Sequence, residues 1–349
     1  MATAAKVVLN PQRRGEKAEA LLRGLRTNVV GQQEALECIV DAYQTLLAGL
    51  NSRQRPLANF LFLGPTGTGK THVVETLAEE LFHDKGALLR VDSAEFQHSH
   101  EIAKLVGSPP GYLGHRETHP VLTQEALDRC HTPELALTLV LFDEIEKASD
   151  ALWQLLLGIL DKAALTLGDN RRVDFSRCLI FLTSNLGAGE MQSLLQPGFG
   201  FAPVARQGAQ RRLDAAALGA ARRRFSPEFF NRLDHVVVFR PLEAAQLERV
   251  LDLELNAIRS RLAASAGEGN GAVEFRCTAA ARAHLLREGA DAKYGARHLK
   301  RALERLLVAP LASLIATRQV GGAERLVVDH DGQATRLEFL REAAAARAA

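Results

Sequence analysis

Short apolar runs alternate with longer amphipathic stretches along the first two thirds of this chain. The apolar runs occupy residues 60–64, 87–92, 137–144, 177–184 and 235–239. Continuous apolar runs of this length are typical of strands that are buried on both faces of a parallel sheet. Because helical patterns lie between them, the alternation predicts an α/β fold with a doubly wound parallel sheet flanked by helices.

The pattern differs at the two ends of the chain. Residues 16–50 contain two amphipathic helical segments separated by Gly31. Beyond Pro241 the pattern becomes mostly helical, at 242–264, 278–289 and 296–317, with short strand candidates near 273–277, 325–329 and 335–340. We therefore predict a tail at 1–15, a large α/β domain at 16–241, a smaller and mainly helical domain at 242–340, and a tail at 341–349.

Composition narrows the class of protein. The 349 residues are enough for about two domains of roughly 150 residues each. Lys and Arg number 43 against 41 Asp and Glu, and this balance does not suggest a general nucleic-acid binder. The four cysteines are far apart and no stretch of eighteen apolar residues occurs, so we expect a reducing compartment, no membrane segment and a soluble, cytoplasmic protein.

The first chemical motif is "GPTGTGKT", which matches the phosphate-binding pattern G-x-x-x-x-G-K-[ST] in full between a predicted strand and a predicted helix. Its glycines let backbone N–H groups converge on phosphate oxygens at the start of a helix. Lys70 is expected to neutralise the β- and γ-phosphates, and Thr71 to bind Mg²⁺. The residues of this predicted ATP site are Gly64, Pro65, Thr66, Gly67, Thr68, Gly69, Lys70 and Thr71.

Two further motifs end neighbouring predicted strands. "LVLFDEIEK" delivers Asp143 and Glu144 at the carboxyl end of a strand, which is the edge where ligands bind in parallel sheets. Asp143 suits Mg²⁺ coordination and Glu144 suits polarisation of an attacking water. "LTSN" places Asn185 after the next strand, where its amide can orient a water or the γ-phosphate. Taken alone, the two carboxylates could equally be a solvated strand end without a function. Asn185 taken alone could be part of an ordinary turn.

Seven motifs in order identify a family. These are "VVGQ" (29–32), "RPLANFLFLGPTGTGKT" (55–71), "VGSPPGYLG" (106–114), "LFDEIEKA" (141–148), "LTSNLG" (182–187), "FSPEFFNRLD" (225–234) and "YGARHLKR" (294–301). The chain resembles the AAA+ ATPases of the Clp family, and in particular their second ATPase ring, over about residues 10–335. The resemblance implies an ATP-driven motor, either an unfoldase or a disaggregase, that threads polypeptide through the pore of a homohexamer.

The resemblance also assigns roles that spacing alone does not. Arg232 is similar to the arginine finger that reaches the nucleotide of the neighbouring subunit, and Arg297 to the second sensor, supplied in cis. Val29 and Val30 correspond to residues that lie against the adenine. Without the family, Arg232 reads as a surface ion pair, Arg297 as a helix-surface charge, and the valines as ordinary core packing.

A turn-rich segment, "GSPPGYLG", corresponds to the family's substrate-gripping pore loop, formed here by Gly111, Tyr112, Leu113 and Gly114. A rigid aromatic ring offers a large contact area that tolerates any substrate sequence. The alternative is that Tyr112 packs on its own domain. A second pore loop is expected within residues 162–172, where "KAALTLGDNRR" departs from the family pattern and leaves the gripping residues in doubt.

Weaker signals leave alternatives open. The "GFGF" segment with Phe199 and Phe201 suits either docking to a barrel peptidase or packing at a subunit interface. Arg222–Arg224 read as a solvated or subunit-facing helix face. Histidines near the pore loop read as solvated or interfacial side chains, with a metal site as the alternative; they are His98, His100, His115, His119 and His131.

The resemblance does not extend to the N-terminal substrate domain and the first ATPase ring that family members usually carry. It is therefore expected to be either a minimal single-ring motor or a piece of a longer protein. Two rival functions remain at this point: a nucleic-acid motor or clamp loader, and a nucleotide-gated scaffold that assembles without translocating substrate.

Overall fold

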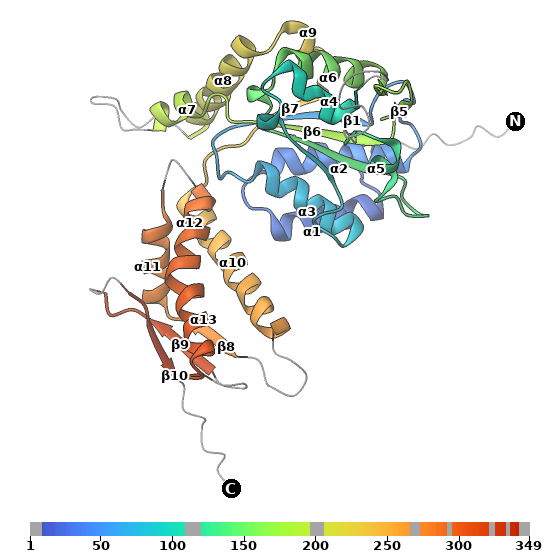
Figure 1. Ribbon diagram of the computed structural model, residues 1–349. Coiled ribbons are helices and arrows are strands. Elements are labelled where there is room, and N and C mark those ends of the chain that lie inside the picture. The colour runs from blue at the N-terminus through green and yellow to red at the C-terminus, as the bar shows by residue number, and fades with distance from the viewer. Residues whose placement is uncertain are drawn as a thin grey trace, which may run out of the picture. The chain divides into compact units, whose positions relative to one another are not determined.

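The structure is a computed structural model of the chain, shown in Figure 1. It describes residues 9–108, 120–195, 206–265, 273–291, 295–320, 325–332 and 336–341. Two compact units are present. The first comprises Met1–Phe62, Thr71–Ser184 and Arg222–Val237, and the second comprises Leu63–Lys70, Asn185–Ala221 and Val238–Ala349.

A five-stranded parallel sheet forms the centre of the α/β part, as the alternating pattern predicts. Its strands are β1 (Ala58–Leu63), β2 (Leu89–Asp92), β3 (Thr138–Asp143), β6 (Cys178–Ser184) and β7 (His235–Val238), in the order β2-β3-β6-β1-β7. β3 pairs with β2 so that Asp143 lies opposite Asp92, and with β6 so that Phe142 lies opposite Leu182. The carboxyl ends of β2, β3 and β6 therefore share one edge of the sheet.

Two of the strands that lead into the predicted nucleotide motifs are fully enclosed. Every residue of β1 and of β6 is buried. Aromatic side chains from both strands meet in the core, where the rings of Phe60 and Phe181 stack with their centroids 5.0 Å apart. Phe62 contacts the same Phe181 ring at 5.6 Å. Such packing fixes the two strand ends from which the site residues follow.

Helices cover this sheet. In the first unit they are α1 (Glu16–Asn28), α2 (Gln33–Leu47), α4 (Ala103–Val106), α5 (Gln124–Asp128), α6 (Asp150–Lys162), α9 (Pro227–Phe230) and nearly all of α3 (Lys70–Phe82). In Figure 1, α1, α2 and α3 lie on one side of the sheet and α6 lies on the other. Gly31 separates α1 from α2 with a φ of 80°, which explains the predicted break in the N-terminal helical pattern.

The structure contains a short β-hairpin that the sequence analysis did not predict. β4 (Ala164–Thr166) pairs antiparallel with β5 (Arg172–Asp174) and places Leu165 opposite Val173. Each strand has only three residues, which is too short for an alternating pattern to stand out. The hairpin coincides with the segment in which a second pore loop is expected.

The helices of the second unit are α7 (Ala188–Leu195), most of α8 (Arg206–Arg224), α10 (Ala244–Ser265), α11 (Ala279–Gly289), α12 (Gly295–Leu303) and α13 (Ala309–Ala316). A π-helical turn, Glu304–Val308, joins α12 to α13 without a break. β8 (Glu274–Cys277), β9 (Arg325–Asp329) and β10 (Glu338–Arg341) form a separate sheet in the order β10-β9-β8. The predicted mainly helical C-terminal region with short strands is confirmed.

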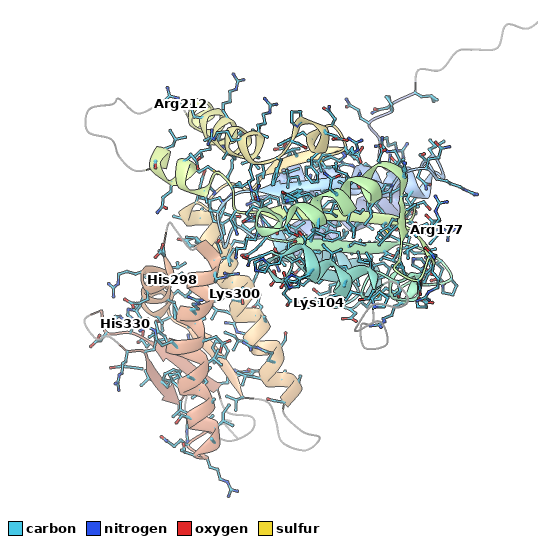
Figure 2. The ribbon with its side chains drawn as sticks, turned by 45° about the horizontal axis from the view of Figure 1, so that its top comes forward. Lys104, Arg177, Arg212, His298, Lys300 and His330 are labelled. Carbon is cyan, nitrogen blue, oxygen red and sulfur yellow. The ribbon has the colours of Figure 1, made fainter. Side chains whose placement is uncertain are left out.

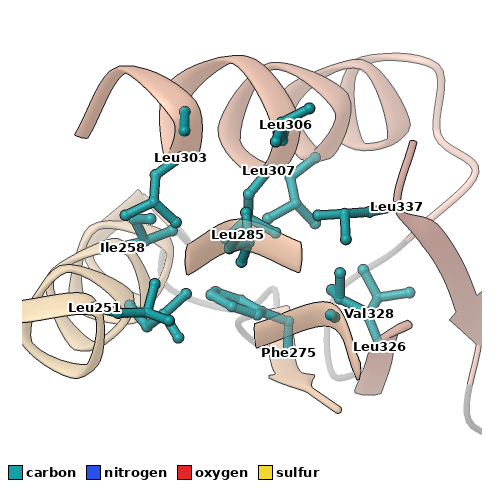
Figure 3. Packing of buried hydrophobic residues seen from close by; sticks show 14 of the residues in the cluster. Leu251, Ile258, Phe275, Leu285, Leu303, Leu306, Leu307, Leu326, Val328 and Leu337 are labelled. Atoms are coloured by element: carbon teal, nitrogen blue, oxygen red, sulfur yellow. The ribbon is translucent and has the colours of Figure 1, made fainter. Parts of the chain in front are cut away.

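The helices and strands of the C-terminal region enclose their own apolar core. Figure 3 shows Leu307 pointing from the end of the α12 segment toward Leu285, and Leu303 pointing toward Ile258. This core explains why the late helices carry an apolar face although they follow no parallel strand.

Figure 2 shows the side chains of both units and labels Arg212 on α8 and Lys300 on α12, both of which are exposed. Arg222–Arg224 are exposed, as expected for a solvated or subunit-facing helix face. Within the described ranges, none of the helices combines the length and apolar character needed to cross a bilayer.

Candidate nucleotide site

The phosphate loop lies between β1 and α3, in the strand–loop–helix context that its sequence requires. Gly64, Gly67 and Gly69 have φ values of 140°, 79° and 97°. Residues with side chains rarely adopt these angles, so the glycines set the path of the loop. The loop ends at Lys70, the first residue of α3, and its backbone amides are thus followed by the N-terminus of a 13-residue helix.

Gly64 is required for a second reason, which is a close approach of two backbones. A Cβ atom at this position would lie 2.2 Å from the carbonyl oxygen of Phe239, which follows β7. The N–H of Phe239 in turn donates to the carbonyl of Leu63 at 2.7 Å. The start of the loop is therefore anchored to the segment that follows β7.

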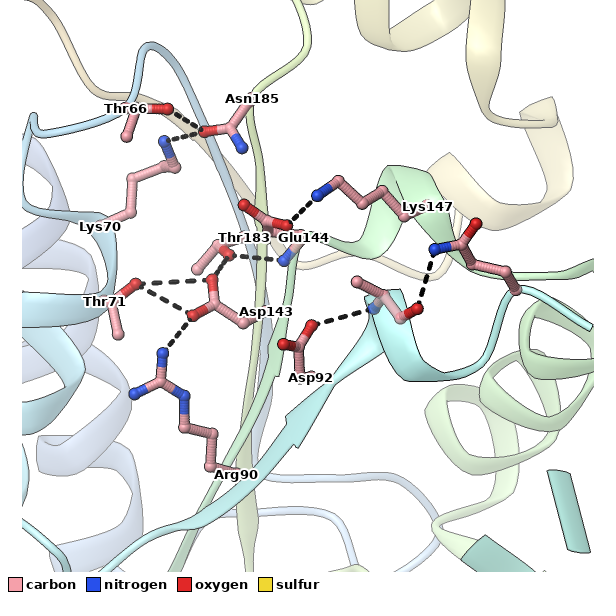
Figure 4. A network of polar contacts seen from close by, with 12 residues as sticks. Thr66, Lys70, Thr71, Arg90, Asp92, Asp143, Glu144, Lys147, Thr183 and Asn185 are labelled. Carbon is pink, nitrogen blue, oxygen red and sulfur yellow. Dashed lines mark hydrogen bonds and ion pairs between the residues drawn. The ribbon is translucent and has the colours of Figure 1, made fainter. Parts of the chain in front are cut away.

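Lys70 is buried, and its ammonium group is held by three acceptors. Nζ donates to the carbonyl oxygens of Gly64 (2.7 Å) and Pro65 (2.9 Å) and to Oδ1 of Asn185 (3.0 Å). Thr66 Oγ1 donates to the same Asn185 oxygen at 3.3 Å (Figure 4). The structure thus brings together Lys70 and Asn185, two residues that the sequence analysis assigned separately to the γ-phosphate region.

Asp143 receives three donors. Thr71 Oγ1 lies 3.3 and 3.5 Å from its carboxylate oxygens, Thr183 Oγ1 donates to Oδ1, and Arg90 Nη2 donates to Oδ2 at 2.7 Å (Figure 4). Thr71 and Asp143, the two predicted Mg²⁺ ligands, are therefore neighbours. Arg90 also lies 3.5 Å from Glu75 Oε1, so it bridges two carboxylates.

Glu144 follows β3 with an unusual backbone. Its φ of 53° and ψ of 45° are left-handed, a conformation that costs a residue with a side chain about 1–2 kcal/mol. The Glu144 N–H donates to Thr183 Oγ1 at 3.2 Å, and its carboxylate pairs with Lys147. The hydrogen bond to Glu144 raises the pKa of Lys147. Backbone strain of this kind is often found at functional positions.

Arg232 makes only intrachain contacts in this single chain. Nη1 donates to the carbonyl oxygen of Glu228 at 2.9 Å, and Nη2 lies 3.1 Å from Glu228 Oε1. Nε lies 3.6 Å from Asp161 Oδ1. These contacts agree with the alternative in which Arg232 forms a surface ion pair. Its role as an arginine finger toward a neighbouring subunit stays a prediction.

Arg297 lies on the first turn of α12, and its side chain is exposed. The preceding residue, Ala296, donates its N–H to the carbonyl oxygen of Gly67 at 3.1 Å. A Cβ atom on Gly295, whose φ is 48°, would lie 2.9 Å from the same oxygen. Within the second unit, the N-terminus of α12 therefore contacts the phosphate loop, and Arg297 directly follows the residue that makes this contact.

Val29 and Val30 follow α1, Val29 buried and Val30 half-buried. Nearby, His72 Nε2 lies 3.2 Å from the carbonyl oxygen of Asn28, which connects α3 to the end of α1. Burial agrees with adenine contact and with core packing alike, so both readings of the valines stand.

Several predicted residues lie outside the part of the chain that the structure describes. They are Gly111, Tyr112, Leu113, Gly114, His115, His119, Phe199 and Phe201. Of the remaining histidines in question, His98 stacks on His100, and His131 lies 3.4 Å from Asp128. Among the residues described, no three His, Cys, Asp or Glu side chains gather as a metal would require.

Sequence reasoning missed Thr183, Arg90 and Lys147. Thr183 precedes Asn185 by two positions at the end of β6, and its hydroxyl serves both Asp143 and Glu144. Arg90 precedes Asp92 by two positions on β2, so it lies on the same face of the strand. The sequence does show polar side chains near the carboxyl ends of the neighbouring strands β2, β3 and β6, and this pattern could have indicated additional site residues.

The residues present fit a magnesium nucleotide. A threonine hydroxyl and an aspartate carboxylate are hard oxygen donors, and Mg²⁺ in phosphate sites commonly uses one or two protein oxygens together with the phosphates. The positive φ values of the loop and the buried Lys70 fit the phosphate groups.

Comparison with known proteins agrees with this reading. Residues 55–236, more than half of the chain, match the family described as AAA domain (Cdc48 subfamily), and residues 242–328 match the C-terminal, D2-small domain, of ClpB protein. A chaperone protein ClpB from Rhodopirellula baltica is 38% identical over 91% of this chain and 34% of its own length. An ATP-dependent Clp protease ATP-binding subunit ClpC from Staphylococcus saprophyticus is 36% identical over 88% of this chain and 36% of its own length.

A solved structure, the S. cerevisiae Hsp104:casein complex in its extended conformation, is also similar. It superposes with a TM-score of 0.77 and 28% identity over 94% of this chain and 53% of that one. The chain thus spans about a third of the length of the curated relatives. It belongs to the Clp-family AAA+ ATPases, as a module that resembles the second ATPase ring of ClpB, ClpC and Hsp104 together with its small domain.

Proposed function

We propose that the protein is an ATP-driven protein-remodelling motor, an unfoldase or disaggregase that threads polypeptide through the pore of a homohexamer. The observation that carries the proposal is the paired arrangement of Lys70 with Asn185 and of Thr71 with Asp143, with Glu144 next in the chain. The names of the curated relatives and the casein-bound Hsp104 structure support it.

In this proposal each side chain has a role in hydrolysis. The loop amides and Lys70 bind the phosphates, while Thr71 and Asp143 hold Mg²⁺, which when bound neutralises charge on the β- and γ-phosphates. Glu144 positions the attacking water, and Asn185, already within hydrogen-bond distance of Lys70, contacts the γ-phosphate side. Arginine is suited to the remaining roles because its planar guanidinium binds phosphate oxygens bidentately.

Those remaining roles belong to Arg232 and Arg297. Arg232 reaches the nucleotide of the adjacent subunit, and this requires release from Glu228 and Asp161. Arg297 contributes in cis from the start of α12, next to Ala296, whose N–H is bonded to the phosphate loop. Val29 and Val30 contact the adenine.

In this proposal residues 111–114 form the pore loop that grips and pulls the substrate polypeptide. Tyr112 grips the chain through ring area rather than through specific hydrogen bonds, so any unfolded polypeptide is accepted. Location in the cytoplasm belongs to the same proposal.

The similarity to ClpC favours a second candidate function, in which the motor feeds a barrel peptidase. Phe199 and Phe201 would form the docking loop. A pull-down with the peptidase, comparing wild type with Phe199→Ala and Phe201→Ala, tests this candidate directly.

Cryo-electron microscopy of the Glu144→Gln variant with ATP and FITC-labelled casein tests the main proposal. We expect a six-membered ring with a chain in its pore next to Tyr112. In parallel, Tyr112→Ala should keep basal ATPase activity within about twofold and lose at least about tenfold in unfolding of a folded fluorescent substrate. A strictly monomeric particle, or ATPase activity stimulated by DNA and not by casein, would contradict the proposal.

A further inference from the structure

The segment that carries Tyr112 is closed at its base by two backbone hydrogen bonds. The N–H of Val121 donates to the carbonyl of Lys104, and that of Leu122 to the carbonyl of Leu105, both at 3.1 Å. Leu105 and Leu122 are fully buried. Lys104, labelled in Figure 2, and Leu122 thus belong to a stem whose ends are anchored in the core.

The β4–β5 hairpin touches the outgoing arm of this stem. The N–H of Gly168, at the hairpin tip, donates to the carbonyl of Val106 at 2.8 Å. A Cβ atom on Gly168 would lie 2.6 Å from the carbonyl oxygen of Gly107 and 2.9 Å from the carbonyl carbon of Ser108. These neighbours are backbone atoms, so they have no side-chain freedom with which to move aside.

The same hairpin is tied to the returning arm. The N–H of Asp174 donates to Gln124 Oε1 at 2.9 Å, and Arg171 Nη1 lies 3.3 Å from Glu125 Oε1. Gln124 and Glu125 begin α5, two residues after the stem closes at Leu122. One hairpin therefore contacts the chain on both sides of residues 109–119.

The hairpin itself is firmly seated. Leu165, Leu167 and Val173 are buried, and the N–H of Leu167 donates to the carbonyl of Arg171 at 2.8 Å. The exposed residues of the tip are polar: Asp169, Asn170 and Arg171. The apolar side chain at the tip, Leu167, faces inward and is not available to contact a passing chain.

We infer that the β4–β5 hairpin is a positioning element that clamps both arms of the stem, with Gly168 as the residue that allows the contact. This inference rests on the proposed function and deepens it. A loop that pulls on a polypeptide needs a base that does not yield, and two hydrogen bonds alone form a weak base. The hairpin continues directly from α6, which starts shortly after Glu144 and Lys147, and so links the region of hydrolysis to the stem.

The inference assigns the predicted second pore loop a supporting role. Leu167 is buried and the N–H of Gly168 is bonded to Val106, so neither residue is placed to grip a substrate chain. Gly168, the residue that makes the contact, lies in the part of the chain where that loop is expected.

The test is Gly168→Ala in the full chain, with Gly158→Ala as the matched control. Gly168 does not have a positive φ, so alanine there probes the close approach alone. Gly158 lies in α6, where a Cβ atom would meet nothing within 4 Å. Hydrogen exchange at the amides of Val121 and Leu122 reports on the stem, and unfolding of a folded fluorescent substrate per ATP hydrolysed reports on its function.

We expect Gly168→Ala to speed exchange at both amides about tenfold and to lower unfolding per ATP at least about fivefold, with basal ATPase activity retained. Combining it with Tyr112→Ala should give no further loss beyond Tyr112→Ala alone, because both act on one element. Gly158→Ala should behave as wild type. Unchanged exchange, or faster exchange with full unfolding activity, would overturn the inference.

A second pair of variants covers the case in which Gly168→Ala does not fold. Arg171→Glu places a second negative charge next to that of Glu125, and adding Glu125→Arg restores a pair of opposite charges. We expect the first change to lower unfolding per ATP roughly twofold and the second to recover it, and failure to recover would count against the clamp. If Tyr112→Ala itself unfolds substrate normally, the proposed function fails, whatever the result at Gly168.

Discussion

Replacing Gly64 by alanine should damage both stability and nucleotide binding, and Gly49 offers a matched comparison. Both glycines have positive φ, 140° for Gly64 and 67° for Gly49. A Cβ atom would lie 2.2 Å from the Phe239 carbonyl oxygen at Gly64 but would meet nothing within 4 Å at Gly49. The pair therefore separates the cost of backbone conformation from the cost of the close approach.

The two costs can be estimated from the geometry. An L side chain in the left-handed region costs about 1–2 kcal/mol, which is the whole effect expected for Gly49→Ala. At Gly64 the conformational cost is about 1–3 kcal/mol, overpacking adds about 1–3 kcal/mol, and loss of the Phe239 N–H bond to Leu63 adds about 1 kcal/mol. We expect Gly64→Ala to lower the free energy of unfolding by roughly 3–7 kcal/mol, a large share of the stability of most domains.

Urea unfolding followed by far-ultraviolet circular dichroism measures the loss of stability in both variants. Binding of a fluorescent ATP analogue measures the second, and only Gly64→Ala should weaken it, by at least about tenfold. If the two variants differ by less than about 1 kcal/mol, the backbones at Gly64 and Phe239 do not approach as described, and the reasoning is refuted.

Three more predictions concern single side chains. Thr183→Val should lower the rate of ATP hydrolysis about tenfold in steady-state assays because it removes a donor to Asp143, and Thr183→Ser should act as wild type. Arg90→Ala should lower the Mg²⁺ concentration needed for half-maximal nucleotide binding roughly two- to fivefold, since Arg90 competes for the same carboxylate; an unchanged Mg²⁺ titration would exclude that competition. Burial is the main cause that lowers the pKa of His284, and the charge of the neighbouring His330 is the next. The imidazole of His284 therefore binds a proton more tightly in the unfolded chain than in the folded protein. Stability from this site should be full above pH about 6.5 and should fall as pH drops through that value, and His284→Gln should flatten this part of the urea-unfolding profile.

The sequence predicted those elements whose signal is local. β1 and β6 are continuous apolar runs and are buried at every position, so burial on both faces could be read directly. The phosphate loop was equally clear, because its glycines and Lys70 are consecutive in the chain.

Contacts that depend on register were not predictable. Arg90 reaches Asp143 because β2 pairs with β3 so that Asp92 lies opposite Asp143, and no local pattern states that alignment. The β4–β5 hairpin was missed because its three-residue strands are held by contacts with Val106 and Gln124, far away in sequence. The π-helical turn at Glu304–Val308 is likewise invisible in a continuous helical pattern.

The unbroken run from Gly295 to Ala316 has a mechanical consequence. With a rise of about 1.5 Å per residue, these elements form a stiff rod roughly 30 Å long. One end is bonded to the phosphate loop through Ala296 and Gly67. A tilt of about 10° at that end would carry the far end through about 5 Å, so a small displacement at the phosphate loop would be magnified at the far end of the rod.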